Sequence, residues 1–375
     1  MSKKWSRHCP RCSSRETVKN GSQGYSHHYL CRACEHSFSR YFGHDPRLLW
    51  IEHIDGVPFR KLGDEYGLSG KQAFVRVTRE LAQLPSNDAL TQTLCDPRRF
   101  SGILVMDGKY VAVKGFARKI PFLYGIDYLT HDIPFGALYT AEDEVSFSRF
   151  FHQVKQLGYD LQIVVADDRS GLKKALLKVF PSARLQLCHN HYLENIRVAL
   201  RVRSEERYRP FFYALKESVF GEREDVTNAI RSFAASIKRE KRLLKNIVSE
   251  IAYRQEELFN YLLLPGCPNN TNLIELYNSH LNGRLKTIKG FQSFASAQCW
   301  LNAWMIRRRT KPFTDCEAKF KYLNGYPSLS LSIKKQARWP ETLVKLGVEA
   351  VKLFEKSALL STEKVTVTSP PPPNW

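Results

Sequence analysis

The chain has 375 residues, enough for several domains with a sizeable core, and 43% of them are hydrophobic, which excludes a disordered protein. Its 57 lysines and arginines against 37 acidic residues give a formal net charge of +20, which favours a polyanionic partner, most simply nucleic acid, over general solubility. No apolar run reaches membrane-spanning length, and nine cysteines in such a chain suit metal ligands or buried thiols better than disulfides, so we expect an intracellular protein.

Residues 1–45 carry a strong metal-binding pattern. Two C-x2-C pairs have eighteen residues between them, and their members are Cys9, Cys12, Cys31 and Cys34. Four thiolates at this spacing are typical of a closed, tetrahedral zinc site. The segment between the pairs has too few apolar residues to fold without a bound metal ion. Its Asn20-Gly21 predicts a hairpin turn. Three histidines could replace a ligand, but we interpret them as surface residues: His27, His28 and His36. We therefore predict a zinc ribbon that holds a structural Zn²⁺.

Residues 46–90 predict three short helices. Pro46 opens the first helix, Pro58 suits the start of the second, Gly67 its left-handed end, and Ser69 the N-cap of the third. The inner face of the third helix carries Ala73, Val77 and Leu81. Its outward polar residues are Lys71, Gln72, Arg76 and Arg79. This pattern resembles a helix-turn-helix, whose second helix reads the DNA major groove, and the alternative is an ordinary helical hairpin. We interpret residues 84–100 as a linker.

Residues 98–191 predict the strands and helices of an α/β sheet. In order, the pattern predicts strands at 102–106, 121–126 and 133–139, a helix at 145–157, a strand at 161–166, a helix at 172–180 and a strand at 183–187. Asp107-Gly108-Lys109 predicts a turn, with a further strand hairpinned back after it. Because chemistry gathers at the carboxyl ends of strands, Asp107 and Asp167 stand out, whereas Asp127 and Asp132 are interpreted as turn formers.

This order of elements, with an acid after the first and the fourth strand, resembles the ribonuclease H-like fold of DDE transposases and integrases. The resemblance implies that Asp107 and Asp167 hold two Mg²⁺ (or Mn²⁺) ions. Asp167 and Asp168 compete for one role. The family pattern reads Val164-Val165-Ala166-Asp167 followed by Gly171-Leu172, which makes Asp167 the ligand and leaves Asp168 as a second choice.

Cys188 and His191 follow the fifth strand with C-x-x-H spacing. A zinc site would need two more ligands, and nothing else in the sequence supports a Cys/His nucleophile. The adjacent residues His189, Asn190 and His191 are weak support for an HNH nuclease. The spacing matches Mutator-like transposases, and this resemblance implies that the pair lies beside the acidic site and helps to position DNA. The alternative is a buried cysteine followed by an ordinary histidine at a helix start.

Residues 192–265 predict a charged helical insertion domain, and residues 266–311 then return to the catalytic domain. Thr271 or Asn272 would cap a helix that carries Glu275 in its first turn. By itself such an acid only favours the helix dipole. However, Thr-Asn-x-Ile-Glu followed by Asn278 is similar to the third-acid helix of Mutator-type insertion-sequence transposases, which implies that Glu275 is the third metal ligand. Asn272 and Asn278 are interpreted as cap or DNA contacts. The residues expected to contact phosphates are Arg284, Lys286, Lys289, Arg307, Arg308 and Arg309.

Together these features are similar to a transposase of a bacterial-type insertion sequence. The resemblance implies a ribonuclease H-like mixed sheet with a helical insertion, preceded by a zinc ribbon and a helix-turn-helix. It also implies double-stranded DNA as partner, at terminal inverted repeats and target, with cleavage and strand transfer by a homodimer or higher oligomer in the cytoplasm, near the nucleoid in a prokaryote. The alternatives are an inactive zinc-dependent DNA-binding regulator and a nuclease of the same fold. Residues 312–375 predict a helical segment over 339–360 and a proline-rich tail without assigned function.

Overall fold

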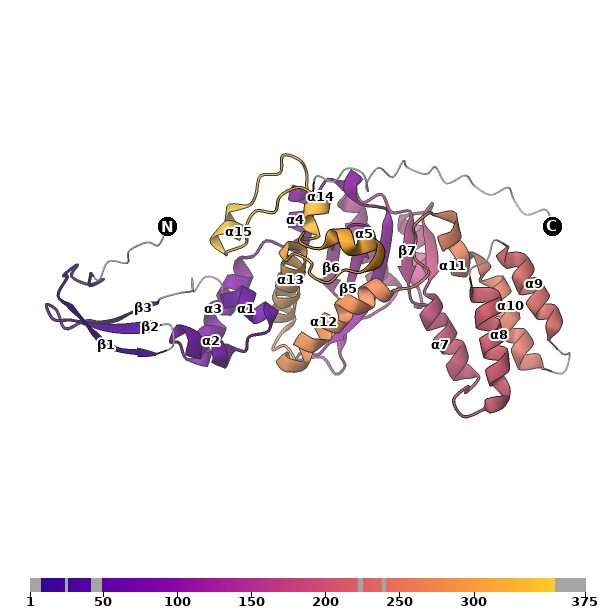
Figure 1. Cartoon of the computed structure of the whole chain (residues 1–375), viewed down its shortest axis with the longest axis horizontal. Coiled ribbons are helices and arrows are strands. Elements are labelled where there is room, and N and C mark those ends of the chain that lie inside the picture. The colour runs from indigo at the N-terminus through magenta and orange to yellow at the C-terminus, as the bar shows by residue number, and fades with distance from the viewer. Residues whose placement is uncertain (1–7, 24–25, 42–48, 222–224, 238–240, 355–375) are drawn as a thin grey trace. The chain divides into compact units, whose positions relative to one another are not determined.

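The computed structural model describes residues 8–23, 26–41, 49–221, 225–237 and 241–354. Pro46 and the proline-rich end of the chain therefore lie outside the described residues. The chain divides into two compact units (Figure 1). The first consists of residues 1–86, 295–308 and 338–350, and the second of residues 87–294, 309–337 and 351–375.

A small antiparallel sheet forms the start of the first unit. Its strands, in order, are β1 (Thr17–Gln23), β2 (Ser26–Cys31) and β3 (Ser37–Tyr41). The expected hairpin turn at Asn20-Gly21 is wrong, because both residues lie within β1, where the register with β2 shifts between Lys19 and Ser22. Gly21 has a φ of 95°, so this dipeptide uses its backbone freedom to form a bulge.

Three helices follow in the first unit: α1 (Leu49–Asp55), α2 (Phe59–Tyr66) and α3 (Gly70–Gln83). The predicted turn between the last two is confirmed, since Gly67 is left-handed with a φ of 66°. Ser69 caps α3 in a capping box with Gln72. The predicted inner face is also confirmed, with Ala73, Val77 and Leu81 buried.

Later segments of the chain complete the first unit. Helix α13 (Phe294–Thr310) buries Trp300 and Trp304, so these side chains pack in the interior. The indole of Trp50 donates a hydrogen bond to the carbonyl oxygen of Leu346 at 2.9 Å, beside the short helix α15 (Glu341–Lys345). The predicted helix over residues 339–360 is wrong beyond α15, because residues 346–354 are not helical.

The second unit is built on a five-stranded mixed sheet in the order β6-β5-β4-β7-β8. The strands are β4 (Ile103–Val111), β5 (Ile120–Asp127), β6 (Phe135–Leu138), β7 (Ile163–Ala166) and β8 (Arg184–Leu187). Strand β4 pairs antiparallel with β5 and parallel with β7. The predicted turn at Asp107-Gly108-Lys109 is wrong, because β4 runs through all three residues, each paired with β5. The predicted mixed α/β architecture is confirmed.

Helices α5 (Glu144–Gln156) and α6 (Leu172–Val179) pack on this sheet with apolar faces that follow helical spacing. The buried side of α5 consists of Phe147, Phe150, Phe151 and Val154. Asp143 caps α5 through a side-chain bond from Ser146 N at 2.8 Å. The crossover β7–α6–β8 accounts for the parallel pairing of its two strands.

The predicted helical insertion after β8 is confirmed. It contains α7 (His189–Ala199), η3 (Glu206–Tyr208), α8 (Arg209–Phe220), α9 (Val226–Ser236), α10 (Arg242–Tyr253), α11 (Gln255–Phe259) and η4 (Asn260–Leu263). Figure 1 shows α8, α9 and α10 side by side, and α11 lies against β8. One continuous apolar core joins these helices to the sheet. Helix α12 (Asn272–Ile288) then returns the chain to the sheet.

The expected linker at residues 84–100 is wrong beyond residue 86, because the chain there forms α4 (Asn87–Leu94) and η2 (Pro97–Arg99). The last elements of the second unit are η5 (Ala318–Leu323) and α14 (Leu329–Ser332), and α14 shares a buried polar network with the residues around α4 and η2. At its centre, Asp132 accepts two hydrogen bonds from the fully buried guanidinium of Arg309, at 2.8 and 2.9 Å. Asp132 is therefore an ion-pair partner and not a turn former, and Arg309 is not free to contact phosphate.

Asp127 opens the turn that follows β5, as expected, because its Oδ1 accepts the N–H of Thr130 at 3.0 Å. It is completely buried, and its carboxylate accepts hydrogen bonds from Ser101, Thr130 and Tyr159. Burial nevertheless raises the pKa of Asp127. Among the described residues, none of the helices has the length and hydrophobicity of a membrane-spanning segment.

Candidate active site and cysteine cluster

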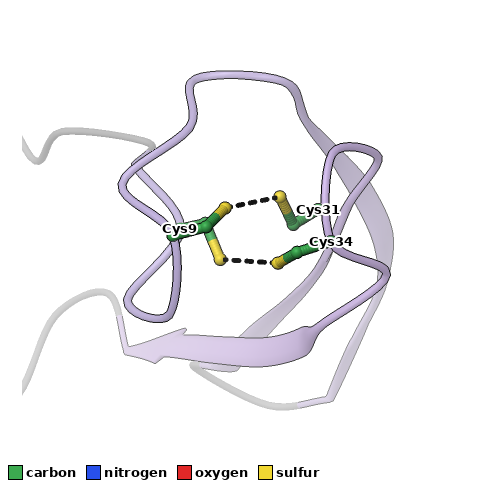
Figure 2. A group of neighbouring side chains, drawn as sticks. Cys9, Cys31 and Cys34 are labelled. Atoms are coloured by element: carbon green, nitrogen blue, oxygen red, sulfur yellow. Dashed lines mark hydrogen bonds between the residues drawn. The ribbon is translucent and has the colours of Figure 1, made fainter.

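The four cysteines of the two C-x2-C pairs converge in the first unit. Their sulfur atoms all lie within 4.8 Å of one another, with Cys9 and Cys34 at 3.6 Å and Cys12 and Cys31 at 3.6 Å. Figure 2 shows Cys9, Cys31 and Cys34 with their sulfurs turned towards one another from two loops. This is the donor set of a tetrahedral zinc site.

Charge in the cysteine cluster supports a cation at its centre. Burial alone would raise the pKa of Cys9, but hydrogen bonds from the backbone N–H groups of Cys12 and Arg11 lower this pKa to about 7. The N–H of His36 also favours the thiolate of Cys34, but the crowded thiols raise the pKa of Cys34 to about 12. Four thiolates at this separation repel one another, so only a bound cation allows all of them to ionise together.

In the second unit, Asp107 and Asp167 come from neighbouring parallel strands in equal register. Val105 pairs with Val165, and each acid lies two residues further along its strand. Because parallel strands are ~4.8 Å apart, the two carboxylates start side by side at one edge of the sheet. Asp107 lies in the middle of β4, whereas Asp167 directly follows β7.

Asp107 is held by two donors. Its Oδ1 accepts the N–H of Gly108 at 2.7 Å, and its Oδ2 accepts the side-chain amide of Asn278 at 2.6 Å. Burial, followed by the charge of Asp167, raises the pKa of Asp107 to about 6. The carboxylate is thus ionised at neutral pH but under electrostatic strain.

Asp167 and Asp168 have different surroundings, which bear on the choice between them. Burial raises the pKa of Asp167, whose buried Oδ1 faces the imidazole of His191. Asp168 points to the insertion instead, where Arg254 donates to both of its oxygens and lowers its pKa. Asp168 therefore joins the sheet to the residue that follows α10, and Asp167 is the acid directed at the site.

Glu275 reaches the same place from the first turn of α12. Its Oε1 accepts the hydroxyl of Thr271 at 2.9 Å and lies 3.7 Å from His191 Nδ1. Thr271 is the N-cap of α12 by position, but its side chain does not cap the helix. One turn further along, Asn278 accepts a hydrogen bond from Tyr124 at 2.9 Å while donating to Asp107, so it ties α12 to the sheet and is not a DNA contact.

Cys188 and His191 lie beside these acids. His191 Nδ1 is 2.7 Å from Asp167 Oδ1 and 3.3 Å from Cys188 Sγ. Cys188 is buried, and its sulfur accepts the N–H of Thr271 at 3.3 Å and lies 3.1 Å from the Thr271 hydroxyl oxygen. Burial raises the pKa of Cys188, which disfavours a reactive thiolate. Asp167, Cys188 and His191 form the second metal-compatible cluster among the described residues.

The adjacent His189 is structural. It is buried, its Nε2 lies 2.6 Å from the carbonyl oxygen of Leu258, and burial lowers its pKa to about 4. The three letters His-Asn-His therefore do not form one site, since His189 and His191 face different parts of the second unit.

Glu142 is an acid at the site that the sequence reasoning missed. Its side chain is only 8% exposed, accepts a hydrogen bond from Tyr110 and lies 3.5 Å from Arg169 Nε. Its charge contributes to the raised pKa of both Asp107 and Asp167. Strands β4 and β6 each pair antiparallel with β5 and therefore run in the same direction. The loop after β6 thus lies at the same side of the sheet as Asp107 and Asp167. The strand order was the signal that could have found Glu142.

The residues expected to bind DNA are mostly on the surface. On α3, four are exposed: Lys71, Gln72, Arg76 and Arg79. Gln72 also accepts the N–H of Ser69 in the capping box. On and after the last turns of α12, Lys286 and Lys289 are exposed and Arg284 is partly exposed. Arg307 forms an ion pair with Asp55 at 2.6 Å within the first unit.

Comparisons with known proteins agree with this chemistry. Residues 105–308 match the family described as "Transposase, Mutator family". Two curated relatives, from Staphylococcus aureus and Enterococcus faecalis, are each described as the transposase for insertion sequence element IS256 in transposon Tn4001. Each is 24% identical over 182 residues, which are 44% of this chain and 43% of the relative. The chain thus spans less than half the length of the curated relatives it matches.

A solved structure, the Drosophila P element transposase strand transfer complex, is 11% identical, with 72% of this chain and 94% of that chain covered at a TM-score of 0.31. The family match, in contrast, covers more than half of the chain and includes Asp107, Asp167 and Glu275. This chain belongs to the Mutator family of transposases.

Proposed function

We propose that this chain is a DDE transposase, which binds the terminal inverted repeats of its element and carries out metal-dependent DNA cleavage and strand transfer. The observation that carries the proposal is the equal register of Asp107 and Asp167 on adjacent parallel strands, with Glu275 approaching from α12. The order of three strands, helix, strand, helix, strand supports a ribonuclease H-like fold for this unit. Family membership supports the reaction class.

Asp107, Asp167 and Glu275 would hold the metal ions. Two features of these residues fit a divalent cation. The charge of Asp167 contributes to the raised pKa of Asp107, and the charge of Glu275 contributes to the raised pKa of Asp167. Carboxylate oxygens suit Mg²⁺ or Mn²⁺. When bound, such ions activate an attacking oxygen and stabilise the leaving oxygen of a phosphodiester.

The residues around the acids position them for this chemistry. Asn278 orients Asp107, and the hydroxyl of Thr271 orients Glu275. Cys188 accepts the N–H of Thr271 and so holds the start of α12 against the end of β8, which is a positioning role. His191, half exposed beside Asp167, can donate a hydrogen bond to a phosphate oxygen of bound DNA.

Other parts of the chain would bind the DNA. The exposed face of α3, with Lys71, Gln72, Arg76 and Arg79, suits major-groove recognition by a helix-turn-helix at residues 46–90. The cysteine cluster suits a structural Zn²⁺ in a ribbon at residues 1–45. The two ends of an element must be paired, so we propose that a homodimer or higher oligomer assembles on DNA.

The test uses the full chain with Mg²⁺ or Mn²⁺ and a duplex that carries the inverted repeats bordering its gene. Metal-dependent nicking at the repeat end and joining to a target plasmid are expected. Asp107→Ala should abolish both while end binding persists. Asp168→Asn is the matched control, because Asp168 is paired with Arg254, and it should remain active.

Two outcomes would contradict the proposal. Binding to the ends with no metal-dependent strand chemistry would indicate a regulator. Cutting of branched DNA that needs no end sequence would indicate a nuclease of the same fold.

A further inference from the structure

A basic groove lies in the second unit, beyond the acids. It runs between the segment that follows β4 and the C-terminal part of α12 with the residues after it. A cavity of about 510 Å³ and a neighbouring cavity of about 280 Å³ share part of their lining and together form the groove. Its cations are Lys114, Arg118, Lys119, Lys286 and Lys289.

Two backbone hydrogen bonds join the two walls of the groove. Lys114 N donates to the carbonyl oxygen of Phe291, and Phe291 N donates to that of Ala112, both at 2.8 Å. Gly290, with a φ of 153°, brings the chain so close that a Cβ there would lie 3.4 Å from Ala112. The groove is therefore preformed, because an isolated β-bridge between Val113 and Phe291 joins its walls.

The charge of the groove is uncompensated. The residues that line the two cavities include no acidic side chain. Within the described part of the chain, all five cations are exposed, and none has a carboxylate partner at ion-pair distance. Cations gathered in a concave site without counter-charges attract a polyanion, and phosphates are the groups they suit.

Aromatic side chains accompany these cations. Phe116 lines the groove and is 38% exposed, and its ring lies 6.4 Å from that of Phe294, itself 37% exposed. Exposed phenylalanines have no polar group to satisfy in water, whereas unpaired bases stack on such rings. Basic grooves with exposed rings are typical of sites that bind single strands.

The groove is continuous with the acidic site. Tyr110 lines its smaller cavity and donates its hydroxyl hydrogen to Glu142, which lies beside Asp107 and Asp167. Along β4, the three to five residues from Asp107 to Tyr110 and Ala112 span ~10–17 Å at ~3.3 Å per residue. At ~3.4 Å per nucleotide, that is ~3–5 nucleotides.

We propose that the basic groove binds an unpaired segment of the DNA strand, a few nucleotides from the phosphate held at the acids, through phosphate contacts and stacking on Phe116. The inference rests on the proposed function and specifies it: the substrate is locally unpaired near the cleavage point. Duplex DNA, in contrast, is bound through other surfaces such as α3.

The experiment measures binding of the full-length protein to fluorescein-labelled oligothymidine without added Mg²⁺ or Mn²⁺. Excess unlabelled duplex occupies the surfaces that bind double strands. Phe116→Ala should weaken oligothymidine binding ~5- to 100-fold, the range for loss of one stacked base, and leave duplex binding within ~2-fold. Phe116→Trp should retain binding. The matched aromatic control is Tyr253→Ala, on the 90% exposed Tyr253 of α10, with no effect expected.

A charge series tests the phosphate contacts. Lys114→Ala with Lys119→Ala should reduce the slope of log affinity against log salt concentration by ~1.4, since each phosphate contact to a single strand contributes ~0.7. The control is Lys178→Ala with Lys216→Ala, which removes the same charge from exposed positions on α6 and α8.

Equal weakening of oligothymidine and duplex binding by Phe116→Ala, or no change in either, would overturn the groove proposal. An equal effect of both lysine pairs on the salt slope would do the same. Because this binding needs neither catalytic metal nor a specific end, it stays measurable even if the protein neither cuts nor joins DNA.

Discussion

The surroundings of Asp107 in the folded protein disfavour its ionised form, although the carboxyl is ionised at neutral pH. Burial and the charge of Asp167 raise its pKa from 3.8 to about 6. A carboxyl whose pKa is higher in the folded state stabilises the fold while protonated, and this contribution is lost as the pH rises through the folded-state value. At neutral pH the ionised Asp107 therefore destabilises the metal-free protein, and Asp107→Asn should make that protein more stable.

The size of the effect follows from the pKa. The pKa of Asp107 rises from 3.8 to about 6, and each pKa unit is worth ~1.4 kcal/mol. The gain in free energy of unfolding from Asp107→Asn is therefore at most ~3 kcal/mol. Asparagine also loses the charge-assisted hydrogen bond from Asn278, so we expect a net gain of ~1–2 kcal/mol. That corresponds to a rise of ~2–8 °C in melting temperature. The gain should be complete at pH 7.5, should be mostly lost at pH 4, and should vanish below pH ~3, where Asp107 is protonated in both states.

Thermal unfolding of the two proteins at pH 7.5 and pH 4, with and without Mg²⁺, measures this directly. Mg²⁺ should stabilise the natural protein, by ~2.7 kcal/mol at a hundred times its dissociation constant, and should leave Asp107→Asn unchanged. Asp132→Asn is the matched control, because Asp132 is also a buried acid but is paired with Arg309, and its loss should destabilise at both pH values. A lower melting temperature for Asp107→Asn at pH 7.5, or an undiminished response to Mg²⁺, would refute the reasoning.

Three further predictions concern the structural parts of the chain. Elemental analysis of the purified protein should find Zn²⁺, which Cys31→Ser should lose and Cys299→Ser, at a half-buried cysteine outside the cluster, should keep; equal zinc in both variants would exclude the cysteine centre. Arg309→Met should lower the free energy of unfolding in urea by ~3–5 kcal/mol, because it leaves Asp132 buried without a partner, and a loss below ~1 kcal/mol would contradict that role. Ser69→Ala should cost ~1 kcal/mol in the same assay by removing the cap of α3, and a neutral result would show that the capping box does not contribute.

The sequence predicted those parts of the site that depend on local pattern. An apolar run that ends in a carboxylate indicates a strand end, and this pattern found Asp107 and Asp167 separately. That the two share a register could not be read locally, because it depends on the pairing of β4 with β7 across sixty residues of chain. The same limit explains why Glu142 was missed: its approach to the acids depends on the order of β6, β5 and β4.

The wrong predictions came from local signals that tertiary pairing overrode. Asp107-Gly108 is a common turn signal, yet β5 offers partners along the whole length of β4, so the strand continues. Asn20-Gly21 forms a bulge for a similar reason. Asp132 and Arg309 are 177 residues apart, and a charged residue in a loop-like or basic stretch gives no local indication of a buried partner at that distance.

The continuation of β4 beyond Asp107 changes what the site can do. Had the strand turned back at Asp107, the acids would stand at the rim of the sheet with no fixed surface beyond them. Instead, the same strand carries Asp107 and then Tyr110, and it leads into the bridge between Val113 and Phe291. On the other side, α12 carries Glu275 at its start and Lys286 near its end. Two rigid elements therefore run from the acids to the basic groove, so the spacing between a phosphate at the acids and a strand in the groove is set by the fold. A substitution that shifts β4 against α12 should then alter the position of cleavage as well as its rate.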